Sequence, residues 1–194
     1  MLSTLFIDPG DAGRGNACAW FEGPVLVDAW FERVFTYSAA DARPPIRGDL
    51  VARWSSARGA FDLVVYERPQ QDERSGSARP RDLMNYTRSG CLLAGAYAGR
   101  DGASILEYTP HDWKGSEPKP VNHARLFDVL TPPERVILGG DVTLKHILAA
   151  RKKGALNRWG RAGVSYYPRN WDTHNLLDAA AIGCFHFGRM PRTG

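Results

Sequence analysis

Two short apolar runs in this chain each end on a carboxylate, and the relation between them constrains the fold more than any other feature. The first runs from Thr4 to Asp8 and is followed by Pro-Gly; the second runs from Phe61 to Glu67 and is followed by Arg-Pro. Both are typical of buried strands. A helical pattern from Ile46 to Gly59 separates them. Because a strand–helix–strand crossover joins parallel neighbours, Asp8 and Glu67 are expected at one edge of a sheet.

The remaining strand patterns complete a mixed α/β sheet. Residues 17–21 and 25–30 are apolar runs joined by Glu-Gly-Pro, which predicts an antiparallel hairpin beside the first strand. A fifth strand is predicted at 104–108. The expected architecture is therefore a five-stranded sheet, with three antiparallel strands followed by parallel strands and flanked by helices.

Helical spacing predicts the covering elements. Residues 81–98 form a long amphipathic helix whose Gly90 and Gly95 are expected to pack closely on the sheet, because glycine weakens an exposed helix. Residues 70–80 are interpreted as a loop beside the sheet edge. Residues 111–120 are either a solvated loop without function or part of a functional segment. Three further helices are expected. The first is 121–130, and the second is a short helix that a capping box at Thr131 to Glu134 opens and Gly139-Gly140 ends. The third is 142–153, with Asp141 as its cap.

The last predicted helix, 173–187, is capped by Asp172 or Thr173. His174, Asn175 and Asp178 lie on one of its faces, since residues three and four apart stack along a helix. Leu177, Cys184 and the small residues 179–181 form an apolar side that permits close approach to a sheet. Asp178 is thus an acid at the start of a helix that is otherwise suited to burial.

Composition sets broad limits. A chain of 194 residues has the size of one domain, and its net charge of +4 is compatible with a polyanionic partner. The three cysteines lack the spacing of a zinc site or a disulfide framework and are expected to be reduced core residues. The sequence contains no pattern of a membrane span or signal peptide, which favours a cytoplasmic protein.

The stretch 145–169 is strongly basic. Its aromatic residues are Trp159, Tyr166 and Tyr167, and it contains no acidic residue. Cations without counter-charges, interleaved with aromatics, favour contact with nucleic acid over a merely solvated face. The cations are Lys145, Arg151, Lys152, Lys153, Arg158, Arg161 and Arg169.

Asp8, Glu67 and Asp178 form a candidate metal site. Taken singly, each has a structural explanation. Asp8 could cap a strand end, Glu67 could pair with Arg68, and Asp178 could be a charge in a helix turn. Jointly, three carboxylates facing one pocket would repel one another unless a cation neutralised them. Oxygen ligands of this kind suit Mg²⁺ or Mn²⁺, and paired ions of this type support phosphodiester cleavage.

On these residues the chain resembles the RuvC-type Holliday junction resolvases of the RNase H-like superfamily. Residues 8–17 are similar to the first motif of that family and 65–69 to the second, which ends in the catalytic Glu. Residues 108–119 resemble the Pro-x-x-x-Lys segment that precedes a helix against DNA, and 174–183 the motif with the last catalytic Asp. The similarity covers nearly the whole chain in order, and the basic insertion at about 139–170 resembles phage-type members.

The resemblance implies a homodimer in the bacterial cytoplasm, encoded by host or phage, that nicks opposing strands of a four-way DNA junction. Asp8 and Glu67 would bridge two Mg²⁺ ions, with Mn²⁺ as a substitute, and Asp178 would complete the site. Asn175 stands where the family commonly has Asp or His, so Asn175 or the adjacent His174 is the expected further ligand. Lys114, as a catalytic residue, and Lys119 would hold phosphate. The DNA arms would contact Lys145, Arg151, Lys152, Lys153, Arg158 and Arg161.

Other functions share parts of this pattern. A non-catalytic junction-binding protein is favoured by Asn175, and a general branched-DNA nuclease would use the same fold. Actin-like sugar kinases and chaperone ATPases also open with Asp-x-Gly, but they need a second similar domain. A ribosomal-RNA-processing relative of RuvC has a similar first motif but is typically shorter and lacks such a basic insertion.

Overall fold

The computed structural model describes most of the chain. The predicted helix from Ile46, nearly all of the predicted loop 70–80, and Arg158, Arg161 and Arg169 lie outside the described residues. The described residues are 1–10, 15–32, 59–69, 80–115, 117–156, 167 and 172–191.

The core is a mixed five-stranded sheet with the order β3-β2-β1-β4-β5. Strand β1 pairs antiparallel with β2, and β2 with β3, whereas β4 runs parallel to β1 and β5 parallel to β4. This order and these directions confirm the predicted five-stranded sheet, in which three antiparallel strands are followed by parallel strands. The strands are β1 (Ser3–Asp8), β2 (Asn16–Glu22), β3 (Val25–Glu32), β4 (Leu63–Glu67) and β5 (Ser104–Tyr108).

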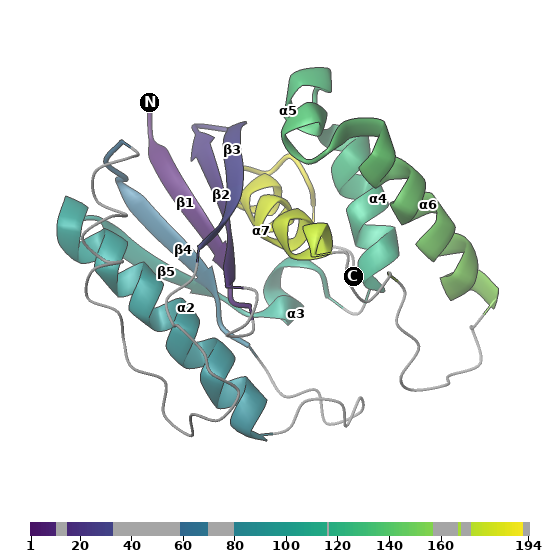
Figure 1. Ribbon diagram of the computed structural model, residues 1–194. Helices are drawn as coiled ribbons and strands as arrows, with labels where there is room; N and C mark the ends of the chain where they lie inside the picture. Colours follow the sequence, from purple (N-terminus) through teal and green to yellow (C-terminus); the bar gives the residue numbers. More distant parts are fainter. Residues whose placement is uncertain are drawn as a thin grey trace.

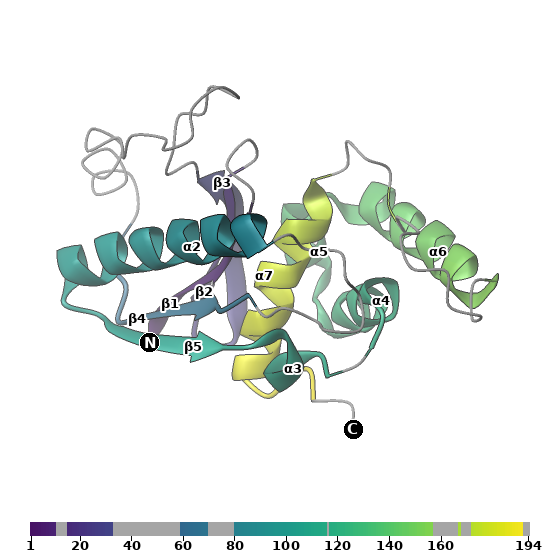
Figure 2. The same ribbon diagram turned by 90° about the horizontal axis from the view of Figure 1, so that it is seen from below.

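Two helices cover opposite faces of the sheet (Figures 1 and 2). Helix α2 (Pro80–Asp101) packs on β4, β5 and β1, and α7 (Thr173–His186) packs on β2, β1 and β3. Successive strand residues point to opposite faces, so Leu5 and Ile7 pack in the α2 layer whereas Phe6 packs in the α7 layer. Each face therefore has its own hydrophobic core.

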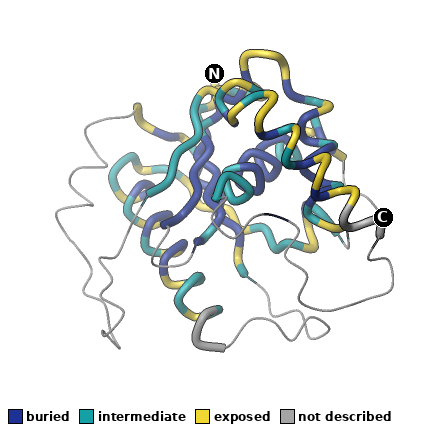
Figure 3. Tube along the Cα trace, turned by 45° about the vertical axis from the view of Figure 1, so that its right-hand side comes forward, coloured by how far each residue is buried: buried dark blue, intermediate teal, exposed yellow. Residues whose placement is uncertain are grey.

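The other helices form a third group beside α7. Helix α4 (Lys119–Val129) packs on α7 and on α6 (Gly140–Leu156), and α5 (Pro132–Ile137) packs on α6 and β3. Strands β1, β2 and β4 are largely buried, whereas exposed positions recur along β5 and along α6 (Figure 3). None of the helices in the described residues has both the length and the apolar composition that crossing a membrane requires.

Several local predictions are confirmed and others are wrong. The capping box is present at Thr131 and Glu134. Helix α6, however, is Gly140–Leu156, and the chain reverses at Gly139 and Gly140, whose φ angles are 88° and 57°. Asp141 therefore lies in the first turn and is not the cap. Residues 111–120 are not a plain loop either: α3 (Pro110–Trp113) buries Trp113 there.

The two α2 residues expected to pack closely on the sheet differ from each other. A Cβ atom at Gly90 would lie 2.6 Å from Pro9 Cγ, in the turn that follows Asp8, whereas a Cβ at Gly95 would meet nothing within 4 Å. Gly90 thus permits the close approach, and the prediction for Gly95 is wrong. Cys18 and Cys184 are buried as expected, but Cys91 on the same helix is exposed.

Gly90→Ala and Gly95→Ala are expected to change stability in opposite directions. The Gly90 substitution forces a methyl group against a rigid proline ring and should lower the free energy of unfolding by about 1–3 kcal/mol. The Gly95 substitution only removes backbone freedom from the unfolded chain and should raise it by about 0.5–1 kcal/mol. Urea unfolding of both variants checks this, and shifts of the same sign would contradict it.

Candidate functional site

The parallel register of β1 and β4 brings two carboxylates together. It pairs Ile7 with Tyr66, so that the next residues, Asp8 and Glu67, both follow at the same edge of the sheet. Asp8 alternates with Ile7, and Glu67 has the same parity as Val65, so both side chains point to the face that α7 covers. Asp8 is 7% exposed and Glu67 8% exposed.

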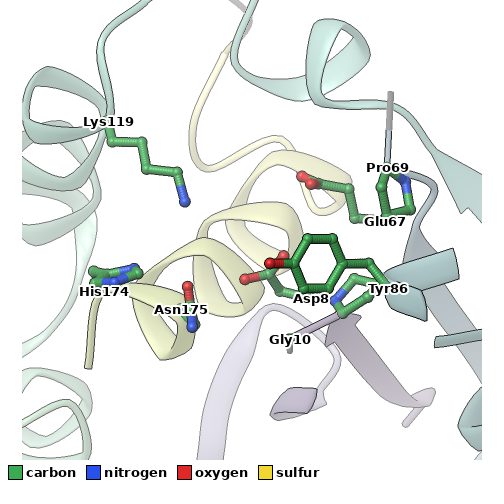
Figure 4. A pocket seen from close by; sticks show the side chains of 9 residues that line it. Asp8, Gly10, Glu67, Pro69, Tyr86, Lys119, His174 and Asn175 are labelled. Atoms are coloured by element: carbon green, nitrogen blue, oxygen red, sulfur yellow. The ribbon is translucent and has the colours of Figure 1, made fainter. Parts of the chain in front are cut away.

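A cavity of about 280 Å³ opens at this edge. Asp8 and Glu67 enter it from the sheet, His174 and Asn175 from α7, and Lys119 from the start of α4 (Figure 4). The other lining residues are Pro9, Gly10, Pro69 and Tyr86. Acidic, basic and amide groups from both ends of the chain therefore share one small volume.

Asp178 is buried beside the cavity and is held by two donors. The Lys119 ammonium bonds to Oδ2, and the His123 Nε2–H donates to Oδ1 over 2.9 Å. Burial alone would raise the pKa of the Asp178 carboxyl, but the nearby Lys119, and after it His123, hold that pKa well below its usual range. Asp178 is therefore the fixed anion of the site.

Asp8 and Glu67 have the opposite electrostatic character. Burial raises the pKa of Asp8 well above its usual range, and the negative charges of Glu67 and Asp178 raise it further. Burial also raises the pKa of Glu67, against the opposing effect of Lys114 and of Trp113, whose Nε1–H donates to Oε2 over 2.7 Å. The nearby lysines therefore do not offset the burial of these two carboxylates, and both pKa values stay above the usual range.

The basic groups of the site differ in charge state. Partial desolvation acts to lower the pKa of the Lys119 ammonium, but Asp178 and, after it, Asp8 raise that pKa above its usual range. Burial, and after it the positive charge of Lys119, lowers the pKa of His174 to about 4, so this imidazole is neutral near pH 7. Lys114 places its ammonium 4.8 Å from the centre of the Trp113 ring, beside Glu67.

The structure brings most of the predicted site residues together. Asp8, Glu67, Asn175, His174 and Lys119 line the cavity, while Asp178 lies beside it on α7 and Lys114 acts on Glu67 from the end of α3. Arg68, the ion-pair partner that the structural interpretation gave to Glu67, pairs with Glu107 at 3.5 Å, while Glu67 accepts a hydrogen bond from Trp113.

The predicted DNA-contacting cations lie elsewhere. Lys145, Arg151 and Lys152 are exposed on α6, and Lys153 lies in the same helix. Helix α6 contacts α4, whose first residue is Lys119. The described cations of the basic stretch are therefore separated from the cavity by α4. Whether they contact DNA stays a prediction.

Sequence reasoning missed Trp113, His123, Tyr167 and Tyr86 as parts of this site. Trp113 stands next to Lys114 in a segment already singled out, and His123 follows Lys119 by one helical turn, so both had a local signal. Tyr167 bonds through its hydroxyl to His123 Nδ1 over 2.7 Å, and its ring stacks between those of His123 and His174. Nothing in sequence spacing connects Tyr167 with α4.

The donor types of the site fit a hard divalent cation. Among the described residues, no group of three or more His, Cys, Asp and Glu side chains is arranged as a preformed metal site. The carboxylates of Asp8 and Glu67, with the Asn175 amide oxygen in the same cavity, are nevertheless the oxygen ligands that Mg²⁺ and Mn²⁺ prefer. A cation there would also relieve the repulsion that raises the pKa of Asp8.

Asp8→Asn and Asp178→Asn should change the stability of the metal-free protein in opposite directions. Asp8→Asn removes a repelled charge and should stabilise the fold, whereas Asp178→Asn leaves Lys119 and His123 without their anion and should cost about 2 kcal/mol. Chemical denaturation with a chelator present measures both.

The pH dependence of this effect has a defined sign. The pKa of Asp8 is raised in the folded state, so protonation favours folding, and the gain from Asp8→Asn should shrink as pH falls from neutral toward the ordinary pKa of aspartate. A gain that grows on acidification would contradict this electrostatic account.

No protein-family model matches the sequence, and no curated protein matches it. Several solved structures are similar to this chain, among them the following three. RuvC of Thermus thermophilus in complex with Holliday junction substrate is 16% identical, with 97% of this chain and 94% of that chain covered and a TM-score of 0.46. A second Thermus thermophilus RuvC structure is 17% identical over 97% and 98%, with a TM-score of 0.40. The yeast mitochondrial Holliday junction resolvase Ydc2 is 13% identical over 96% and 79%, with a TM-score of 0.44.

Proposed function

We propose that this protein is a metal-dependent, structure-selective DNA endonuclease that resolves four-way junctions by phosphodiester hydrolysis. The observation that carries the proposal is the convergence of Asp8, Glu67 and Asp178 with two lysines at one edge of an RNase H-like sheet. Adjacent parallel strands deliver the first two carboxylates, and the helix packed on the same face delivers the third. Mg²⁺ is the proposed cofactor, two ions per site, with Mn²⁺ as a substitute.

Each residue has a distinct part in the proposed chemistry. Asp8, Glu67 and Asp178, with Asn175, would hold the cations, whose chemistry is to polarise the phosphate and to lower the pKa of an attacking water. Lys119 and Lys114 are positioned to bind phosphate oxygens as point charges. Trp113 keeps Glu67 oriented through the bond to its Oε2, and Gly90 lets α2 approach the turn after Asp8.

The assembly proposed for junction resolution is a homodimer. Two nicks on opposing strands require two active sites, and each chain supplies one. The exposed cations of α6, Lys145, Arg151 and Lys152, would contact the phosphates of the arms. Their charge carries no sequence information, so these contacts would hold the junction while its shape selects it.

A non-catalytic junction-binding protein is the second candidate. It is favoured by the two donors that already occupy the oxygens of Asp178 and by an amide, Asn175, at a position where a further charged or imidazole ligand was expected. Such a protein would bind four-way DNA and never cut it with Mg²⁺ or Mn²⁺.

Asp8→Asn is expected to abolish Mg²⁺-dependent cleavage of a synthetic four-way junction while its junction affinity stays within about twofold of wild type. The substitution removes a carboxylate ligand but changes no phosphate contact. Cleavage and gel-shift assays on a junction, a flap and plain duplex separate a resolvase from a general branched-DNA nuclease. Asp128→Asn, at an exposed position of α4, is the matched control and should cut normally. Full activity of Asp8→Asn would reject the endonuclease, and binding without cleavage by wild type would select the second candidate.

Replacing Lys145, Arg151 and Lys152 together by Gln should weaken junction binding and reduce its salt dependence. Removal of one cation–phosphate interaction makes the slope of log affinity against log salt shallower by about 0.9. Fluorescence anisotropy across a salt series measures both quantities. Arg88→Gln removes an exposed cation from α2, in the layer on the opposite face of the sheet, and should change neither. The same effect per removed charge in the two variants would show general charge attraction in place of a contact surface on α6.

A further inference from the structure

A hydrogen-bonded chain of two buried side chains ends on Asp178. His123, on α4, has no exposed side-chain surface, and its two ring nitrogens lie 2.9 Å from Asp178 Oδ1 and 2.7 Å from the Tyr167 hydroxyl. Tyr167 is itself buried, and its ring lies 5.6 Å from that of His123 and 5.6 Å from that of His174. Three aromatic rings thus form a stack whose middle member is Tyr167.

The direction of each hydrogen bond in this chain follows from the groups that form it. An ionised carboxylate only accepts, so Nε2 of His123 carries the proton that faces Asp178. Lys119 already supplies a full positive charge to the other oxygen of Asp178, and a second buried cation beside it would be costly. His123 is therefore neutral, its Nδ1 accepts, and the Tyr167 O–H is the donor.

From this geometry we propose that His123 and Tyr167 are positioning residues that fix the Asp178 carboxylate and thereby set the affinity of the cavity for a divalent cation. The inference rests on the proposed function, since it concerns the same site. Tyr167 holds the imidazole in one tautomer and one ring orientation, and the imidazole holds Asp178 Oδ1. Mutation of a residue that hydrogen-bonds to a metal ligand in this way typically lowers metal affinity or activity by about 10–100-fold.

The two donors on Asp178 differ in what they can do. Lys119 is a flexible side chain that is 40% exposed, so its ammonium can leave Oδ2 for a phosphate. His123 is enclosed and belongs to the packed face of α4, so its bond to Oδ1 can persist. This division leaves one oxygen of Asp178 permanently oriented while the other exchanges partners.

The first test is spectroscopic and needs neither metal nor cleavage. In the metal-free protein labelled with ¹⁵N-histidine, the ring of His123 is expected as the neutral Nε2–H tautomer with an unprotonated, hydrogen-bonded Nδ1. Loss of one signal set in His123→Gln assigns it among the five histidines. In Tyr167→Phe the Nδ1 shift should move toward that of an unbonded nitrogen. A protonated Nδ1 in wild type, or an unchanged shift in Tyr167→Phe, would overturn the proposal.

The second test measures binding of Mn²⁺ alone, from the electron paramagnetic resonance signal of the free ion. His123→Leu should weaken binding by about 10–100-fold, while His123→Gln, which keeps an N–H donor near the Nε2 position, should remain within about threefold of wild type. Tyr167→Phe keeps the stacked ring and should give an intermediate loss of about threefold to tenfold. His146→Leu on α6 is the matched control and should bind as wild type does.

These readouts separate failure of the inference from failure of the proposed function. If His123→Leu and Tyr167→Phe bind Mn²⁺ as wild type does while wild type cuts junctions, the positioning role is wrong and the endonuclease stands. If the variants lose Mn²⁺ as expected but wild type cuts no DNA, the positioning role stands and the nuclease proposal fails. Because Tyr167→Phe removes one oxygen atom and keeps the packing, it decides the question even where His123→Leu does not fold.

Discussion

The parallel pairing of β1 with β4 is the constraint on which the candidate site depends. Its register places Asp8 and Glu67 at one edge, and the alternation of strand side chains turns both toward α7. A slip of one residue would send one carboxylate into the α2 layer, among Leu5 and Ile7. The register that packs Phe6 and Val65 in the α7 layer and Ile7 in the α2 layer therefore positions the site as well as the core.

Helix packing then adds the groups of opposite charge. The small residues of α7 allow it to lie close to the sheet: a Cβ at Gly183 would stand 2.3 Å from the Phe21 ring. That approach carries Asp178 beside the sheet edge, and α4 packs on α7 with Lys119 and His123 one turn apart. The site thus lies where the sheet, α7 and α4 meet. The sheet and α7 contribute carboxylates, and α4 contributes the ammonium of Lys119 that partly neutralises them.

The sequence was sufficient to predict the strands, their directions and the two strand-end carboxylates, because short apolar runs and turn residues are local signals. The same local patterns failed where the outcome depends on neighbours. Gly90 and Gly95 look alike along the chain, and only the position of Pro9 distinguishes them. Trp113, His123 and Tyr167 escaped notice as site residues for a related reason: each acts through a partner that is distant in sequence, and spacing along one helix does not reveal which layer its side chain will meet.

The charges of the site explain why its three carboxylates cannot be equivalent. Asp178 has a lysine and a histidine as donors, which keep its pKa low in spite of its burial, whereas burial and then the negative charges of Glu67 and Asp178 raise the pKa of Asp8. A cation entering the cavity would therefore gain most from Asp8 and Glu67, whose repulsion it relieves, and would find Asp178 already ionised and oriented. The lysine that partners Asp178 in the absence of a cation is one of the two proposed to hold phosphate. If the proposed function holds, cation and phosphate binding are linked by charge, because a cation that neutralises Asp178 in place of Lys119 would release that ammonium for the DNA backbone.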